Sequence, residues 1–145
     1  MQPDVTVVVP VHDAMPDLVG CVESLLDQDA HPAAPETVTA PDVAPDTAPT
    51  PDTAADDRRV TYEVVLVDDG SADAGPALLD EVAAAHAHVR VVHQENSGWP
   101  GRPRNVGIDL ARGRYVFFCD ADDRLGPEAL RRMVRFADET ASDVV

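Results

Sequence analysis

Runs of β-branched residues alternate with amphipathic segments along this chain. The first run, over residues 5–11, is rich in valine and stops at polar His12 and Asp13, which is typical of a buried parallel strand. Leucine and valine then recur at the spacing of one helical face, so we predict a helix over 16–28. The same patterns predict strands over 62–67, 89–92 and 115–119, helices over 75–87 and 102–113, and a helix from about 127.

Strand and helix alternate, and this order predicts an α/β fold, an open and mostly parallel sheet flanked by helices. Residues 143–145 resemble the start of one more strand. We therefore expect 1–145 to be the amino-terminal part of a domain, truncated after about the fifth strand. Ligands of such sheets bind at the carboxyl ends of the strands.

One segment breaks the alternation. Residues 31–59 consist mainly of Pro, Ala, Thr and Asp, and valine is their only large apolar residue type. Such a segment buries too little apolar surface to offset the entropy of ordering it. We predict a disordered insertion in the loop after the first helix.

The charge balance narrows the possible partners. The chain has 27 acidic and 11 basic residues, a formal net charge of −16, and every basic residue is an arginine. A strongly acidic chain is repelled by polyanions, so we exclude nucleic acid and an anionic membrane surface as partners. The absence of lysine also excludes any mechanism that needs a lysine of this chain.

The apolar runs and the cysteines indicate the cellular compartment in which the protein is expected. No apolar run approaches the ~20 residues that span a bilayer, and the amino terminus lacks the pattern of a secretory signal. Cys21 and Cys119 form no CxxC pair and read as buried thiols in a reducing compartment. We expect a cytoplasmic protein that reaches the inner face of the cell membrane, if at all, only through regions outside this chain.

Groups of polar residues, most of them aspartates, follow three of the predicted strands. They are His12 with Asp13, Asp68 with Asp69, and Asp120, Asp122 and Asp123. Because the carboxyl ends of parallel strands meet at one edge of a sheet, we expect these groups to converge. Clustered carboxylates repel one another unless a cation compensates, and oxygen ligands favour Mg²⁺ or Mn²⁺. We therefore predict that Asp120, Asp122 and Asp123 together hold such an ion, alongside substrate phosphates; the alternative is that these acids cap the next loop and face water.

Other residues near the same edge suggest a nucleotide. A lone carboxylate such as Asp69 can accept a hydrogen bond from the imide N–H of uracil, while Asp68 turns into the loop and steadies it. Arg102 and Arg104 begin a helix after a glycine-bearing loop, a position that suits phosphate. Trp99 can lie against a base or a sugar, or simply pin the loop, and the sequence does not decide between these roles.

Four motifs together resemble family 2 glycosyltransferases. They are VVVPVHD at 7–13, VLVDDGS at 65–71, ENSG at 95–98 with PRNVG at 103–107, and FCDADD at 118–123. They occur in the family's order over nearly the whole chain apart from the insertion. The third motif is most similar to wall-polymer transferases of the teichoic-acid type.

The resemblance implies a GT-A (Rossmann-like) fold, a nucleoside diphosphate sugar donor, UDP-linked in most of the family, and inversion at the anomeric carbon. It also implies a divalent metal, Mn²⁺ or Mg²⁺, and a glycan or polyol-phosphate acceptor at the cell surface. The residues implied for nucleotide-sugar binding are Pro10, Val11, His12, Asp13, Asp69, Arg102, Arg104, Asn105, Asp120, Ala121 and Asp122. Of these, the resemblance implies that Asp120 and Asp122 form the metal-binding Asp-x-Asp element, with Asp122 as the direct metal ligand.

One feature of this chain departs from the family pattern, and one feature of the family is expected outside this chain. His12 and Asp13 replace the Tyr-Asn pair common in the family, so stacking on the nucleoside is expected to differ. The family's general base is expected beyond Val145, so no catalytic base is named and this chain alone is not expected to transfer sugar.

Two other functions compete with the transferase. A phosphoacceptor receiver module also has paired acids after one strand and an aspartate after a later one, but it needs a lysine that this chain lacks. A non-catalytic nucleotide-binding scaffold would share the fold without the reaction.

Overall fold

A computed structural model describes residues 2–33 and 59–145 as one parallel sheet with helices packed on it. The strands are β1 (Val5–Val11), β2 (His31–Pro32), β3 (Thr61–Asp69), β4 (Val89–Gln94) and β5 (Tyr115–Phe118). The helices are α1 (Asp17–Leu26), α2 (Gly75–Ala85), α3 (Gly101–Leu110) and α4 (Ala129–Thr140).

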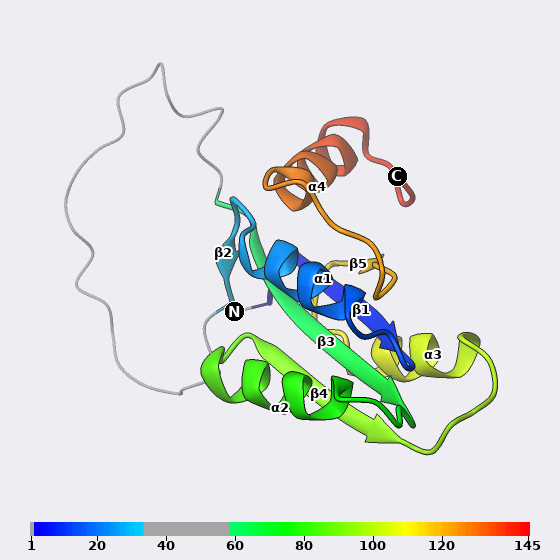
Figure 1. The fold of residues 1–145 in the computed structure, drawn as a ribbon. Helices are drawn as coiled ribbons and strands as arrows, with labels where there is room; N and C mark the ends of the chain where they lie inside the picture. The colour runs from blue at the N-terminus through cyan, green and yellow to red at the C-terminus, as the bar shows by residue number, and fades with distance from the viewer. Residues whose placement is uncertain (1, 34–58) are drawn as a thin grey trace, which may run out of the picture.

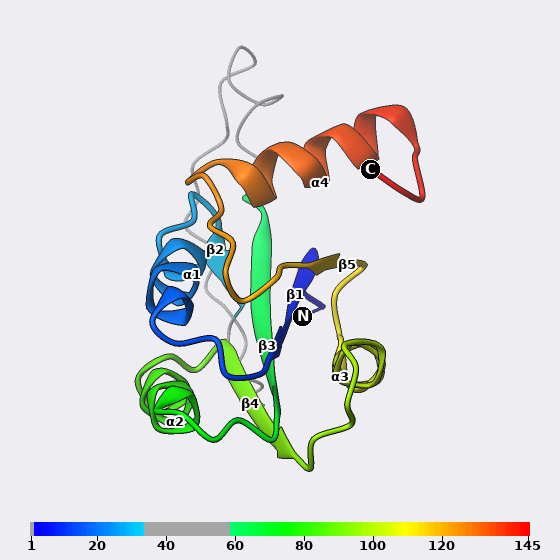
Figure 2. The same cartoon turned by 45° about the vertical axis from the view of Figure 1, so that its right-hand side comes forward.

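The sheet is built outward from its two longest strands. β1 pairs with β3 on one side and with β5 on the other, while β2 and β4 both pair with the far side of β3; all four pairings are parallel. Helices α1 and α2 cover one face and α3 covers the other (Figures 1 and 2). The α/β fold predicted from the alternating pattern is confirmed.

The core follows from this layering. Strands covered on both faces are apolar along their whole length, and the valines of β1 and β3 are buried on both sides of the sheet, among them Val7, Val8 and Val65. The helices add four fully buried leucines, Leu18, Leu25, Leu79 and Leu130, and the fully buried thiol of Cys21.

The second acidic pair lies within a strand. The sequence pattern ends this strand at Val67, but β3 continues through Asp68 and Asp69, because β4 pairs alongside it as far as Gln94. The two acids are therefore held by ladder hydrogen bonds.

The predicted end of α3 at Gly113 is wrong. The helix ends at Leu110, and the Gly113 N–H donates to the Thr6 hydroxyl at 2.8 Å. A Cβ at Gly113 would lie 2.4 Å from the Thr6 backbone nitrogen. This glycine therefore serves the close approach of two chain segments, not a helix cap.

The predicted insertion begins later than residue 31. His31 and Pro32 form β2, and the N–H of His31 donates to Val60 at 2.8 Å. Residues 34–58 lie outside the described residues, so disorder there remains a prediction. At the other end of the chain, 143–145 are not part of a strand.

Within the part of the chain that the structure describes, no helix has both the length and the apolarity to cross a bilayer.

Candidate functional site

A cavity of about 440 Å³ opens at the carboxyl edge of the sheet, where β1, β3 and β5 end beside the first turn of α3. Its lining residues are Pro10, Val11, His12, Asp69, Asn96, Gly98, Trp99, Pro100, Pro103, Arg104, Asp120 and Ala121. The predicted convergence of the three strand ends is therefore confirmed.

Asp69 lines this cavity, and its carboxylate accepts three hydrogen bonds. Its Oδ1 accepts from the Gln94 side chain at 2.6 Å and from the Ser97 N–H at 3.0 Å, and its Oδ2 accepts from the Ser97 hydroxyl at 2.8 Å. Burial alone would raise the pKa of Asp69, but these donors outweigh it and lower the pKa. Asp69 is thus an oriented carboxylate with acceptor capacity left for a ligand.

His12 forms one wall of the cavity. Its Nδ1 lies 3.0 Å from the Asp69 carbonyl oxygen, and its Nε2 lies 3.4 Å from the Asn96 amide nitrogen. About half of the imidazole remains exposed. The ring that replaces the family's tyrosine is therefore held in place with a surface free for a ligand.

Gly70 allows the loop over 95–98 to pack closely against the carboxyl end of β3. Gly70 has a φ of +73°, and a Cβ there would lie 2.6 Å from the Asn96 backbone nitrogen. Only glycine fits this backbone and this contact. The Asp-Asp-Gly-Ser motif therefore supplies both the carboxylate and the space for the loop over 95–98.

Asp68 faces away from the cavity, as predicted, and stabilises the strand end. Its Oδ1 accepts from the Ser71 N–H at 3.0 Å, and its Oδ2 lies 2.8 Å from Nδ1 of His93. The other ring nitrogen of His93 lies 2.8 Å from Asp80 on α2. These two carboxylates, Asp68 first, raise the pKa of His93.

Asp13 ties two strand ends together. Its N–H donates to the Ser71 hydroxyl at 3.1 Å, and its carboxylate accepts from the Ala72 N–H at 2.7 Å. It also lines a second cavity of about 360 Å³, which contains Asp122 and shares His12 with the first. Asp13 therefore combines an anchoring role with a position beside the acidic loop.

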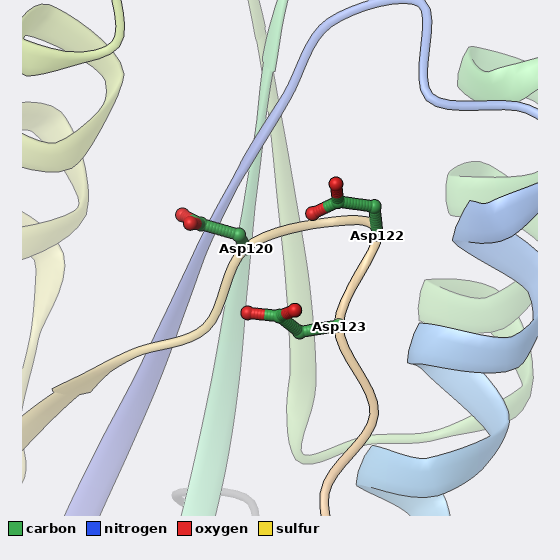
Figure 3. Close-up of side chains that lie close together, drawn as sticks. All are labelled: Asp120, Asp122 and Asp123. Atoms are coloured by element: carbon green, nitrogen blue, oxygen red, sulfur yellow. The ribbon is translucent and has the colours of Figure 1, made fainter.

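The acidic loop after β5 forms a cluster of three carboxylates. Oxygens of Asp120, Asp122 and Asp123 lie within 4.8 Å of one another and are exposed. The carboxylates of Asp122 and Asp123 turn towards Asp120, whose own carboxylate points to α3 (Figure 3). The set of exposed oxygen ligands fits Mg²⁺ or Mn²⁺, and the structure brings together the three acids that the sequence groups at this strand end.

Arg104 supplies the positive charge at the cavity. Its guanidinium lies 2.8 Å from an Asp120 oxygen. The other two residues predicted on this helix, Arg102 and Asn105, are exposed and do not line the cavity. A phosphate in the cavity would therefore meet Arg104 first.

The hydrogen-bond donors to Asp69 could not be predicted from the sequence. The strand predicted over 89–92 leaves Gln94 in the following loop, and the motif at 95–98 does not show what its side chains bind. The one hint in the sequence is that polar residues follow the predicted strand over 89–92 directly. Their roles appear only once β4 pairs with β3 in register, Asp69 opposite Gln94.

Comparison with known proteins agrees with this geometry. A sequence model described as Glycosyl transferase family 2 matches residues 6–145. The succinoglycan biosynthesis protein ExoO of Rhizobium meliloti is 34% identical over 142 residues, which are 98% of this chain and 32% of that protein. The poly(ribitol-phosphate) beta-glucosyltransferase of Bacillus spizizenii is 32% identical over 141 residues, 97% of this chain and 18% of that enzyme.

A solved structure shows the same architecture. The crystal structure of S. aureus TarS 1-349 in complex with UDP-GlcNAc matches with a TM-score of 0.70 and 29% identity, over 97% of this chain and 32% of that one. This chain therefore spans no more than about a third of the length of these relatives.

These findings confirm the expected GT-A fold and reject the receiver module, whose family is a different one. The four motifs at the carboxyl edge of the sheet and a family match over nearly every residue lead to one conclusion. This chain belongs to family 2 of the glycosyltransferases.

Proposed function

We propose that this chain is the donor-binding part of an inverting, metal-dependent glycosyltransferase that uses a UDP-linked sugar. The observation that carries the proposal is the single cavity in which an oriented Asp69, a cationic Arg104 and the Asp120 carboxylate meet. A base, a phosphate and a metal need these three kinds of group side by side.

Each residue has a part that its surroundings suit. Asp69, with its pKa lowered, accepts a hydrogen bond from the base. Arg104 and the first turn of α3 attract the diphosphate, because helix amino termini and guanidinium groups both favour anions. His12 flanks the nucleoside between the two, with Pro10 and Val11 beneath it and Ala121 beside it. Arg102 and Asn105 would contact only a ligand that extends out of the cavity.

The acidic loop would hold the metal. Asp120 and Asp122 are the proposed ligands, and Asp123 lies close enough to join them. Bound Mn²⁺ or Mg²⁺ would neutralise charge that develops on the departing diphosphate.

The rest of the proposal concerns the whole protein. The general base is proposed to lie beyond Val145, and the acceptor to be a wall-type glycan or polyol phosphate. The poly(ribitol-phosphate) transferase of Bacillus spizizenii and the TarS complex with UDP-GlcNAc support this choice of acceptor and donor. The cytoplasmic location remains a prediction.

Calorimetry with the purified protein tests the proposal. UDP should bind in the presence of Mn²⁺ and at least tenfold more weakly with chelator. Asp122→Asn should abolish the metal dependence, whereas Asp109→Asn, an exposed acid on α3 outside both cavities, should leave it unchanged. GDP and dTDP in the same assay identify the base.

Two results would reject the transferase. A folded protein that binds no nucleoside diphosphate with or without metal would remove the donor site. Metal-independent nucleotide binding by this chain, together with no release of UDP from any UDP-sugar by the protein that includes the proposed general base, would favour the scaffold.

A further inference from the structure

Trp99 is the largest exposed aromatic group at the cavity, and its role is open. It is the only tryptophan of the chain, its side chain is 65% exposed, and it lines the same cavity as His12, Asp69 and Arg104. We propose that Trp99 is the stacking surface for the nucleobase of the donor. This inference rests on the proposed function and assigns one further binding residue to it.

The indole ring is placed by its neighbours. A Cβ at Gly101 would lie 2.5 Å from Cη2 and Cζ2 of Trp99, so the ring lies directly against the first residue of α3. Any side chain at position 101 would push it away. The glycine therefore sets where the ring lies at the cavity wall.

The backbone beside Trp99 is tied to the base-binding carboxylate. The Ser97 hydroxyl lies 3.0 Å from the Trp99 carbonyl and 2.8 Å from Asp69 Oδ2. The Gly98 N–H donates to the Asn96 side chain at 2.7 Å. The position of the ring is thus coupled to that of the carboxylate proposed to read the base.

The exposure distinguishes a stacking surface from a loop anchor. An aromatic ring that anchors a loop buries most of its area in apolar contact. Trp99 leaves most of its area open instead, next to a cavity with one wall formed by the half-exposed His12. A planar, exposed ring suits a nucleobase, because every base has a π-face that can stack on it. The edge of the same base could donate a hydrogen bond to Asp69.

The test compares two ligands on matched variants, in calorimetry with Mn²⁺. Trp99→Ala should weaken UDP binding by about fivefold to 100-fold, the range found for stacked bases. Pyrophosphate, which has no base, should bind within about twofold of the unchanged protein. Trp99→Phe keeps a ring and should hold UDP within about threefold.

Gly101→Ala moves the ring without removing it. It should weaken UDP binding in the same direction as Trp99→Ala and have little further effect when combined with it. Gly126→Ala is the matched control, because a Cβ there meets nothing within 4 Å. In the unchanged protein, the fluorescence of this single tryptophan should change on UDP binding and not on pyrophosphate binding.

The outcomes are distinct. If Trp99→Ala binds UDP as tightly as the unchanged protein, the stacking role is wrong while the proposed function stands. An equal loss for UDP and pyrophosphate would assign the ring to loop anchoring and overturn the inference. If the unchanged protein binds no nucleoside diphosphate at all, the proposed function fails and the inference fails with it.

Discussion

The guanidinium of Arg104 lies 2.8 Å from a carboxylate oxygen of Asp120. This ion pair joins the first turn of α3 to the acidic loop after β5. A metal at the acidic loop and Arg104 therefore compete for one carboxylate, unless a phosphate comes to lie between them.

Replacing Arg104 should separate metal binding from nucleotide binding. Arg104→Gln frees Asp120, so Mn²⁺ alone should bind as tightly as before or more tightly. UDP should bind about tenfold to 100-fold more weakly, because a charge-assisted hydrogen bond contributes about 1.5–3 kcal/mol. Calorimetry measures both affinities. Arg132→Gln, an exposed arginine on α4, is the control for the change in net charge, and a weaker Mn²⁺ affinity in Arg104→Gln would contradict the competition.

His93 should make the strand end sensitive to pH. Its two ring nitrogens each lie 2.8 Å from a carboxylate, of Asp68 and of Asp80. A carboxylate only accepts hydrogen bonds, so this geometry requires the imidazolium. The pKa of His93 is raised above 6.5 in the fold, so its stabilisation is complete below pH 6.5 and is lost as the pH rises through the folded pKa.

NMR titration of the His93 ring should therefore give a pKa above 6.5, and Asp80→Asn should reduce it. The melting temperature should fall on the alkaline side of this pKa, and His93→Gln should flatten that part of the profile. Burial would raise the pKa of Asp68, but the contact with His93 and the hydrogen bonds from Ser71 outweigh it and lower the pKa, so only the His93 part is shared with this prediction. A His93 pKa at or below 6.5 would show that the imidazolium bridge does not form.

Glu63 should be one of the most sensitive positions for stability. It is fully buried in β3 and accepts hydrogen bonds from the Thr6 hydroxyl and from the backbone and side chain of Arg112. Burial raises its pKa, but the bonds from Arg112 and Thr6 outweigh this and lower it. Its removal takes the acceptor from the buried Thr6 hydroxyl and one carboxylate from Arg112, and a buried group that loses its hydrogen bond costs about 1–3 kcal/mol.

Urea unfolding of Glu63→Ala measures that loss. Glu139→Ala is the control, because Glu139 lies on the surface of α4 and its exposed pair with Arg135 is worth at most ~0.5 kcal/mol. Equal unfolding free energies for the two variants would mean that the Glu63 network contributes little.

Gly107 should link the packing of α3 to the cavity. A Cβ there would lie 2.1 Å from Cγ1 of Val8, which is fully buried in β1. Alanine favours a helix by about 1 kcal/mol over glycine, but overpacking a tight core costs about 1–3 kcal/mol, and Val8 has no room to move. Gly107→Ala should therefore lower the unfolding free energy.

The same substitution should also weaken UDP binding, because α3 carries Pro103 and Arg104 at the cavity wall. Denaturation and calorimetry on one sample report both effects. Gly126→Ala, made at an open position, should change neither. An unchanged UDP affinity in a destabilised Gly107→Ala would show that the cavity does not depend on this contact.

The layered fold, and the edge of the sheet at which the chemistry lies, could both be predicted from the amino-acid sequence. Valine-rich runs alternating with amphipathic segments specify buried parallel strands, because each pattern matches one burial geometry. The Asp-Asp-Gly-Ser and Asp-Ala-Asp-Asp motifs follow those runs directly. Their meeting at one sheet edge, Asp69 beside Asp120, then follows from the parallel direction of the strands alone.

Which of these groups act together could not be predicted in this way, since contacts between distant segments depend on strand register and packing. The register of β4 against β3 brings Gln94 to Asp69 and His93 to Asp68. Packing of α3 on β1 directs Arg104 to Asp120 while Arg102, two residues away, stays exposed. The local sequence cannot distinguish the two arginines, because both lie in the first turn of the helix. Which of them faces the cavity depends on how the helix packs against the neighbouring strand.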